Sequence, residues 1–249
     1  MIRVFISGHE DRILRPFGER IMFLSRLLDL PHKEVHLYKK GSKDWDQDFL
    51  DLLNIAKGSE RIVLHAPGER PNGNHVAVSN AHLKPLDPEA EGDANYFSIN
   101  WDKLTYNKKI LDNIDFNKTI CWSARVSVSP RGPRTDLDKV PDSFLEKYSD
   151  FNFINIGMPV SHPRPNWRSV WKKGAYKHPY DLHTTAWIIK KSHKYIGIDA
   201  GGTHFALAIK DPTKDILYLR YASTYNGGAT SPIQDTIIRK GVTVCDDLV

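Results

Sequence analysis

The chain has 249 residues, a formal net charge of +5, 40% hydrophobic residues and 26% charged residues. These proportions are typical of folded globular proteins and exclude a collagen-like, disordered or disulfide-rich chain. The length suits one large domain or two small ones. The moderate positive charge is compatible with a polyanionic partner but does not require one.

Cysteine usage and hydropathy bear on the cellular compartment. The chain has two cysteines, Cys121 and Cys245, which argues against a disulfide framework and against a cysteine-based zinc site. The apolar part of residues 1–8 is too short for a signal peptide, and no stretch approaches the roughly 20 apolar residues of a transmembrane helix. We therefore expect a protein without a membrane span in the reducing cytoplasm.

Strand and helix patterns alternate through the first half of the chain. Short runs of β-branched and aromatic residues indicate strands, and apolar residues on one helical face indicate helices. This alternation is typical of a parallel sheet covered by helices. The patterns predict strands at residues 2–6, 35–38 and 61–65, helices at about 17–30 and 45–55, and long surface loops over 67–93 with one weak strand at 75–79.

A second α/β series follows, with strands predicted at residues 118–122, 151–156 and 194–198. One helix is predicted at about 141–148, and another begins after Asp181. The Asp181 carboxylate can accept hydrogen bonds from the free amides of a first helical turn. The stretch between the second strand and Asp181 is rich in His, Pro and Arg and is predicted to be irregular. The resulting prediction is an α/β fold with two Rossmann-like domains, an abbreviated one at 1–115 and a second at 116–249.

The junction that follows the strand at 194–198 carries the strongest functional signal. An apolar strand runs into Gly201 and Gly202 and then into a predicted helix. Glycines allow close backbone approach, and a helix start presents unpaired amides and the positive end of the helix dipole. A diphosphate would fit there. Glycine pairs also form ordinary tight turns between a strand and a helix, so this alternative stays open.

Two known families resemble this junction. By itself it resembles the phosphate-binding hairpin of sugar kinases of the hexokinase and actin kind. Those proteins need a second phosphate loop and an adenosine-binding segment far downstream, whereas only residues 205–249 follow His204 here. Together with the preceding helix, residues 181–208 resemble the C-terminal domain of heptosyltransferase-like glycosyltransferases, which have the two-domain GT-B fold. We favour the second resemblance.

The heptosyltransferase-like element reads Ile-Gly-x-Asp-Ser/Thr-Gly-x-x-His-x-Ala and contacts the diphosphate of a nucleotide sugar. The chain departs from it at Ala200, where the family usually has Ser or Thr, and Thr203 is a candidate for the missing hydroxyl. The resemblance implies a UDP- or ADP-sugar donor. The positions that match are Gly197, Asp199, Gly201, His204 and Ala206, and the implied donor site comprises Asp199, Gly201, Gly202, Thr203 and His204.

Further donor contacts are expected at the start of the C-terminal domain. Related enzymes open this domain with a strand and a basic loop that faces the same diphosphate, and this chain offers Ser123, Arg125 and Arg131 there. A guanidinium can pair two phosphate oxygens and stabilise the charge on the leaving nucleoside diphosphate. Gly157 ends the next predicted strand, where such folds seat the base and ribose. Solvated surface arginines are the alternative interpretation.

The resemblance also implies a proton acceptor in the loop after the first strand. Heptosyltransferase-like enzymes place an acidic residue there, and an inverting transferase needs a base to take the proton of the attacking hydroxyl. Asp11 is the first candidate, Glu10 the second and His9 the third, although the family's own loop sequence is not reproduced. A solvated charge cluster is the alternative. We expect no required metal and no cofactor besides the nucleotide sugar.

A basic and aromatic segment at residues 164–177 is predicted to bind the acceptor. Cations interleaved with aromatic rings can hold phosphates while they stack on bases or sugars. The acceptor is either a hydroxymethylated base in DNA, flipped out of the stack as for a compact viral enzyme, or a lipopolysaccharide or other glycan. A sugar kinase and a nucleic-acid-binding module without catalysis are the remaining alternatives. The candidate acceptor-binding residues are Arg164, Trp167, Arg168 and Lys172.

Overall fold

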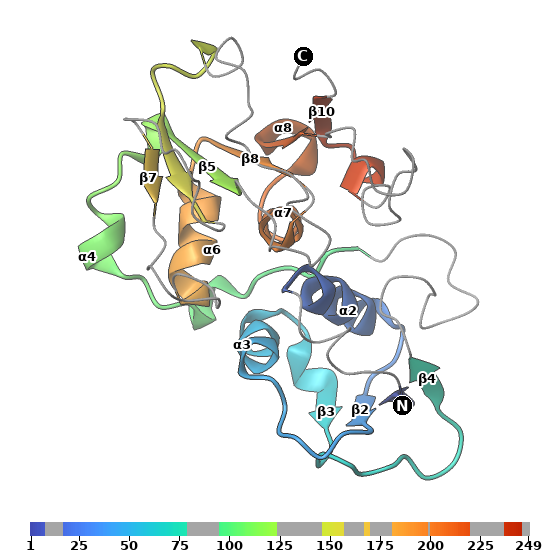
Figure 1. Cartoon of the computed structure of the whole chain (residues 1–249). Helices are drawn as coiled ribbons and strands as arrows, with labels where there is room; N and C mark the ends of the chain where they lie inside the picture. Colours follow the sequence, from blue (N-terminus) through green and yellow to red (C-terminus); the bar gives the residue numbers. More distant parts are fainter. Residues whose placement is uncertain are drawn as a thin grey trace. The chain divides into compact units, whose positions relative to one another are not determined.

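A computed structural model describes residues 1–7, 17–78, 95–123, 146–156, 167–169, 181–198, 200–219 and 237–245. The chain divides into two compact units, Met1–Leu104 and Thr105–Val249. Each unit contains one parallel β-sheet (Figure 1). This division lies earlier in the sequence than the domain boundary expected at residues 115–116. The predicted α/β fold class with two Rossmann-like sheets is confirmed.

The first unit holds a four-stranded sheet of order β3-β2-β1-β4. Each neighbouring pair is parallel, so every connection between them crosses over the sheet. The strand order reverses between β1 and β4. The strands are β1 (Ile2–Ile6), β2 (Val35–Lys39), β3 (Ile62–Leu64) and β4 (Val76–Val78).

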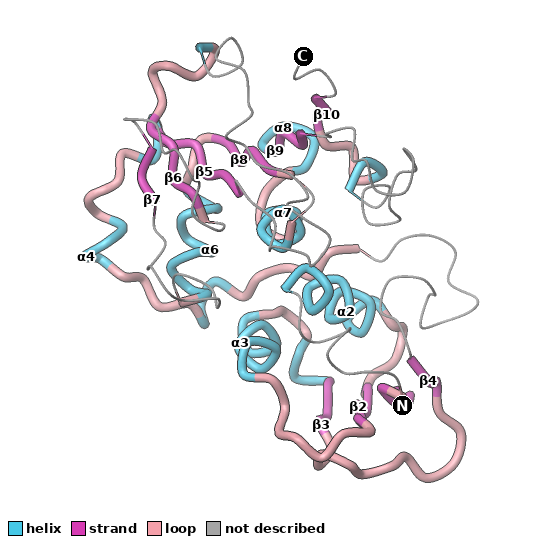
Figure 2. Tube along the Cα trace, in the orientation of Figure 1, coloured by secondary structure: helices cyan, strands magenta, loops and turns pink. Residues whose placement is uncertain are grey.

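Two helices, α2 (Phe17–Asp29) and α3 (Gln47–Ile55), cover one face of this sheet (Figure 2). The face is formed by alternate strand residues such as Val4 and Leu37, which are fully buried. At the end of α2, the Arg61 guanidinium donates to the carbonyls of Leu27, Leu28, Leu30 and His32. Arg61 thus satisfies carbonyls that a helix end leaves without partners. Two short 3₁₀ helices complete the unit, η1 (Ser59–Arg61) and η2 (Trp101–Lys103).

The second unit holds a six-stranded parallel sheet of order β10-β9-β8-β5-β6-β7. The chain builds outward from β5 through β6 to β7, returns to β8 on the other side of β5, and continues outward. This is the doubly wound Rossmann order, and it reverses between β5 and β8. The strands are β5 (Thr119–Ser123), β6 (Asn152–Asn155), β7 (Trp167–Ser169), β8 (Lys194–Gly197), β9 (Ile216–Leu219) and β10 (Thr243–Cys245).

Both faces of this second sheet are covered. On one face, α6 (Leu182–Lys191) and α7 (Gly201–Leu207) lie side by side (Figures 1 and 2). The other face carries a buried cluster that includes Trp122, Phe153 and Ile196. The described residues also include the short helices α4 (Lys108–Leu111), η3 (Phe116–Lys118) and α8 (Pro212–Asp215).

The structure confirms one element boundary predicted from the sequence and corrects another prediction. Asp181 caps α6 as predicted, since its carboxylate accepts from the Thr184 amide at 2.7 Å and from the Thr184 hydroxyl at 3.1 Å. The prediction of a wholly irregular stretch before Asp181 is wrong at residues 167–169, which pair with β6 as β7. Three residues are too few to show a periodicity, so this strand is identified by its pairing alone. Among the described helices, none is long and apolar enough to cross a membrane.

Candidate functional site

The candidate site lies at the carboxyl edge of the second sheet, where β5 and β8 end. Their last residues, Ser123 and Gly197, are direct partners in the parallel register. Helix α7 begins at Gly201, four residues after β8 ends. Ligands of open α/β sheets bind outside the carboxyl ends of the strands at the point where strand order reverses. The sheet therefore brings Ser123 and the Gly201-Gly202 pair to the position at which this fold binds nucleotides.

Two glycines near this junction, Gly197 and Gly202, are required by the protein's own packing. A Cβ on Gly197 would lie 2.5 Å from the Thr203 hydroxyl and 2.6 Å from the Tyr195 ring. A Cβ on Gly202 would lie 3.0 Å from the Tyr195 hydroxyl and 3.1 Å from Ser123. Both glycines therefore allow the first turn of α7 to approach β5 and β8 closely. The missing side chain of Gly202 faces the sheet, which gives this glycine a role that does not involve a ligand.

A buried hydrogen-bond network supports the first turn of α7. The Thr203 hydroxyl donates to the Ile198 carbonyl at 2.5 Å and lies 3.1 Å from the Tyr195 hydroxyl. The Tyr195 hydroxyl also bonds the Ser123 side chain. Burial raises the pKa of Tyr195 far above its ordinary value, while the Thr203 and Ser123 hydrogen bonds oppose this rise. Tyr195 thus positions the loop, and sequence reasoning had assigned it no role.

The start of α7 lacks a side-chain cap. Its N-cap residue is Ala200, which has extended backbone angles and no oxygen to offer the first-turn amides. By contrast, α3, α6 and α8 are each capped by an aspartate: Asp46, Asp181 and Asp211. The amides of Gly201 and Gly202 have no carbonyl four residues back within the helix, because they open it. This helix start is therefore suited to an anion supplied from outside the chain.

The predicted donor residues fall into two groups. Ser123, Gly201, Gly202 and Thr203 are brought together at the β5–β8 edge, although the hydroxyls of Ser123 and Thr203 are engaged with Tyr195. His204 lies in the first turn of α7 and is buried. Their contacts to a donor remain predictions. The predicted site residues that lie outside the described part of the chain are His9, Glu10, Asp11, Arg125, Arg131, Gly157, Arg164, Lys172 and Asp199.

Two of the predicted acceptor residues, Trp167 and Arg168, belong to β7. They pair in register with Phe153 and Ile154 of β6. Strand β7 is the last strand of the sheet on the β6 side within the described residues. Acceptor binding by this segment remains a prediction.

The first sheet presents an equivalent edge. Its strand order reverses between β1 and β4, and Ser7, just after β1, donates its amide to the Val78 carbonyl at 3.0 Å. Asp11 follows this edge in the sequence and lies outside the described residues. Lys39 ends the neighbouring strand β2. Its side chain is buried, donates to the Asp44 carbonyl at 3.0 Å and lies 5.2 Å from the ring centroid of Trp45.

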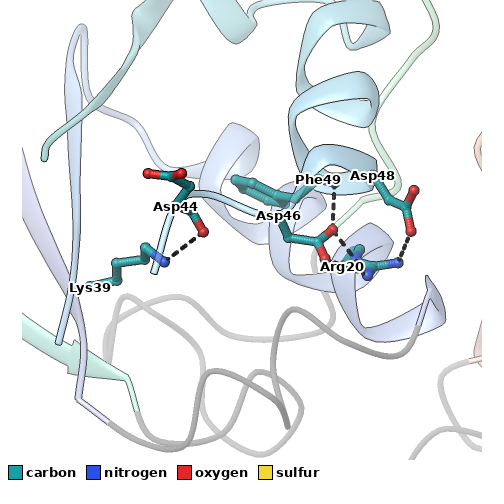
Figure 3. A network of polar contacts seen from close by, with 6 residues as sticks. All are labelled: Arg20, Lys39, Asp44, Asp46, Asp48 and Phe49. Carbon is teal, nitrogen blue, oxygen red and sulfur yellow. Dashed lines mark hydrogen bonds and ion pairs between the residues drawn. The ribbon is translucent and has the colours of Figure 1, made fainter. Parts of the chain in front are cut away.

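The buried Arg20 joins α2 to the start of α3 (Figure 3). Its guanidinium lies 3.0 Å from the Asp46 carboxylate and 3.1 Å from Asp48. Asp46 also accepts from the Phe49 amide. Asp-x-Asp patterns occur in the sequence at 44–48 and at 136–138. In the first of these, Asp46 caps α3 and pairs with Arg20, whereas Asp48 only pairs with Arg20.

The comparisons with known proteins concern the fold. No protein-family model and no curated protein matches the chain. Among solved structures, it is similar to the bacterial iron-containing dodecameric glycosyltransferase TibC of enterotoxigenic E. coli H10407, with a TM-score of 0.54 and 11% identity over 93% of this chain and 63% of that chain. A dodecameric iron-containing heptosyltransferase TibC in complex with ADP-D-beta-D-heptose gives a TM-score of 0.51 and 12% identity over 93% and 61%.

The chain shares its fold with these two TibC structures. A family 9 glycosyl transferase from Veillonella parvula DSM 2008 is also similar, with a TM-score of 0.48 and 12% identity over 99% of this chain and 86% of that chain. The chain spans about three fifths of the length of the two TibC chains.

Within the described ranges, no group of three or more His, Cys, Asp or Glu side chains is placed to hold a metal ion.

Proposed function

We propose that this protein transfers a sugar from a nucleoside-diphosphate donor to an acceptor hydroxyl, with the donor diphosphate bound at the start of α7. The observation that carries the proposal is the uncapped first turn at Ala200, placed where the strand order of the second sheet reverses. The shared fold with TibC supports sugar transfer as the chemistry. Its complex with ADP-D-beta-D-heptose supports an ADP-sugar as the first donor to test.

The roles of the residues follow from the charge that develops during transfer. As the glycosidic bond breaks, negative charge grows on the leaving diphosphate, and fixed amide donors at a helix start stabilise that charge without reorganising. Arg125 and Arg131 follow β5 in sequence and would neutralise the same phosphates. On the acceptor side, Asp11 or Glu10, which follow β1 in the sequence, would take the proton of the attacking hydroxyl.

We take a glycan hydroxyl as the first acceptor to test and a base in DNA as the second. DNA is distinguished from a glycan by the salt dependence of binding. Phosphate contacts release counterions, so DNA affinity falls steeply as salt rises. Binding of duplex DNA with a steep salt slope would move the acceptor assignment to DNA.

The test of the donor site uses Ala200, since its position at the N-cap can be filled by a side chain. Ala200→Asp places a carboxylate over the first-turn amides, where it caps the helix and repels a diphosphate. Ala200→Ser is the matched control, because it supplies a cap without charge. We expect ADP or UDP to raise the unfolding temperature of the natural chain and of Ala200→Ser but not of Ala200→Asp.

The panel should include ADP, UDP, GDP and CMP, and ligand binding should be followed as a shift in unfolding temperature. A ligand at 100 times its dissociation constant stabilises the folded state by about 2.7 kcal/mol, which such a measurement resolves. The proposal is abandoned if none of the four nucleotides stabilises the natural chain. It is equally abandoned if Ala200→Asp, folded as shown by its own unfolding transition, binds the nucleotide as tightly as Ala200→Ser.

A further inference from the structure

The loop between β2 and α3, residues 40–46, has no role in the proposed function. It follows Lys39, the last residue of β2, so it lies at the carboxyl edge of the first sheet. Strand β2 pairs with β1, and the strand order reverses between β1 and β4. Open α/β sheets bind their ligands outside the carboxyl ends of the strands beside such a reversal. The loop therefore occupies a binding position of this fold.

Hydrogen bonds hold this loop at its start, across its width and near its end. The Lys40 amide donates to the last carbonyl of β1 at 3.1 Å. The buried Lys39 ammonium donates to the Asp44 carbonyl at 3.0 Å (Figure 3). The Trp45 indole N–H donates to the His65 carbonyl at 2.9 Å. The loop is thus held in one shape by the protein itself, which lowers the entropic cost of binding a ligand.

The same loop presents positive charge to solvent. Residues 39–45 read Lys-Lys-Gly-Ser-Lys-Asp-Trp, so three lysines and one aspartate give a net charge of +2. Lys40, Ser42 and Lys43 are exposed. Among the described residues, no carboxylate pairs with the Lys40 or Lys43 ammonium. Two exposed ammonium groups on a short, fixed loop create a local positive potential that attracts anions.

Two acidic residues close to this loop are engaged with protein groups. Asp46 pairs with Arg20 and caps α3 (Figure 3). Glu69, in the loop after β3, accepts from the Ala66 amide and lies 3.1 Å from His65 Nδ1. Both carboxylates are therefore neutralised or hydrogen-bonded within the protein and oppose an incoming anion less than free carboxylates do.

We propose that residues 40–43 bind the phosphate group of a phosphomonoester. Lysine ammonium groups bind phosphates as point charges, which suits Lys40 and Lys43. The Ser42 hydroxyl can donate to a phosphate oxygen, and Gly41 has no side chain to keep the backbone away from it. A basic side chain after the second strand is also how some doubly wound sheets accept a phosphate on their ligand. The site lies in the first unit and is independent of the donor site at α7.

The test is a titration of the complete, isotope-labelled chain with inorganic phosphate, followed through the NMR shifts of the backbone amides. Sodium chloride keeps the ionic strength constant. We expect saturable shifts in residues 40–44. Lys40→Gln and Lys43→Gln each remove one charged donor, so each should weaken phosphate binding about 10-fold. Lys33→Gln is the matched control, because this exposed lysine precedes β2 at the opposite edge of the sheet, and it should bind as the natural chain does.

Ala200→Asp separates this site from the donor site. Phosphate at the start of α7 would shift the amides of Gly201 and Gly202, and those shifts should disappear in Ala200→Asp while the shifts in residues 40–44 persist. Failure of the donor site therefore leaves this proposal intact, and the reverse also holds.

Two results would overturn the proposal. One is the absence of saturable shifts in residues 40–44 at tens of millimolar phosphate. The other is equal weakening by Lys33→Gln and Lys43→Gln, or no weakening by either Lys40→Gln or Lys43→Gln, because binding then does not depend on this loop. Equal unfolding temperatures of the natural chain and the variants show that the substitutions leave the fold intact.

Discussion

Close contact with its neighbours determines what a residue does at the start of α7. The sequence predicts a phosphate contact at Gly202, whereas its missing Cβ faces Tyr195 and Ser123. Thr203 is predicted as a substitute hydroxyl, yet that hydroxyl bonds the Ile198 carbonyl and Tyr195. These residues shape the turn, which leaves the backbone amides of Gly201 and Gly202 as the groups that the turn can offer to an anion.

Gly202→Ala tests this packing. Its Cβ would be 3.0 Å from the Tyr195 hydroxyl and 3.1 Å from Ser123, so the helix must shift. Insertion of a methyl group into a packed site costs about 1–3 kcal/mol, measurable by urea unfolding. Gly197→Ala, with contacts of 2.5–2.7 Å, should cost more. Equal stability of the natural chain and both variants would show that α7 does not lie this close to β5 and β8.

Buried acids of the second unit predict a loss of stability in alkali. Burial raises the pKa of the Cys121 thiol and of the Tyr195 phenol far above their ordinary values. Folding therefore opposes their ionisation, and the stability that depends on their neutral forms is complete below the unfolded-state pKa values, about 8.5 and 10. It is lost progressively as pH rises above them.

The expected slope is up to about 1.4 kcal/mol per pH unit for each group that ionises only when the chain unfolds. Urea unfolding between pH 8 and 10.5 measures it. In a plot of unfolding free energy against pH, Cys121→Ala should remove the decline that begins near pH 8.5. The decline at higher pH, which depends on Tyr195, should remain. An unchanged slope in Cys121→Ala would show that this thiol is accessible to solvent.

At the level of elements, α3 and α7 differ in how their first turns are capped. Asp46 caps α3 and also pairs with the buried Arg20, while Asp48 only pairs. The start of α3 is thus capped by a side chain of the protein itself. The start of α7 has Ala200 in the capping position and depends on what binds there.

A comparison of two aspartates separates capping from charge pairing. Asp46→Ala removes a cap worth about 0.5–2 kcal/mol in addition to one partner of Arg20. Asp48→Ala removes only a partner, so it should destabilise less. Asp46→Asn keeps a capping oxygen and should fall between them. Thermal or urea unfolding ranks the three variants, and a larger loss in Asp48→Ala than in Asp46→Ala would contradict the assigned capping role.

At the scale of the whole molecule, the two units have different tasks under the proposed function. The candidate donor site is built entirely from the second unit, at the ends of β5 and β8 and the start of α7. The candidate base, Asp11 or Glu10, belongs to the first unit and follows β1 in the sequence. Donor binding should therefore be confined to one unit.

Hydrogen exchange with and without saturating ADP, or UDP if it binds more tightly, tests this division. Amides in β5, β8 and α7 should exchange more slowly with ligand, because a bound ligand suppresses local opening of the segments that contact it. Those of β2 and β3 should be unchanged and serve as the internal control. Protection centred on the first unit would place the nucleotide there and reject the assigned donor site.

Local patterns in the sequence determined the element types, the Asp181 cap, the α/β class and the position of the glycine junction, because these depend on periodicity and neighbouring residues. Tertiary structure decided the rest. Strand order placed Ser123 beside Gly197, and packing assigned Gly202 and Thr203 to Tyr195. Pairing of distant strands also created β7 and brought His36 to His65. Such contacts join residues far apart in the chain, and no local pattern encodes which distant partner a side chain meets.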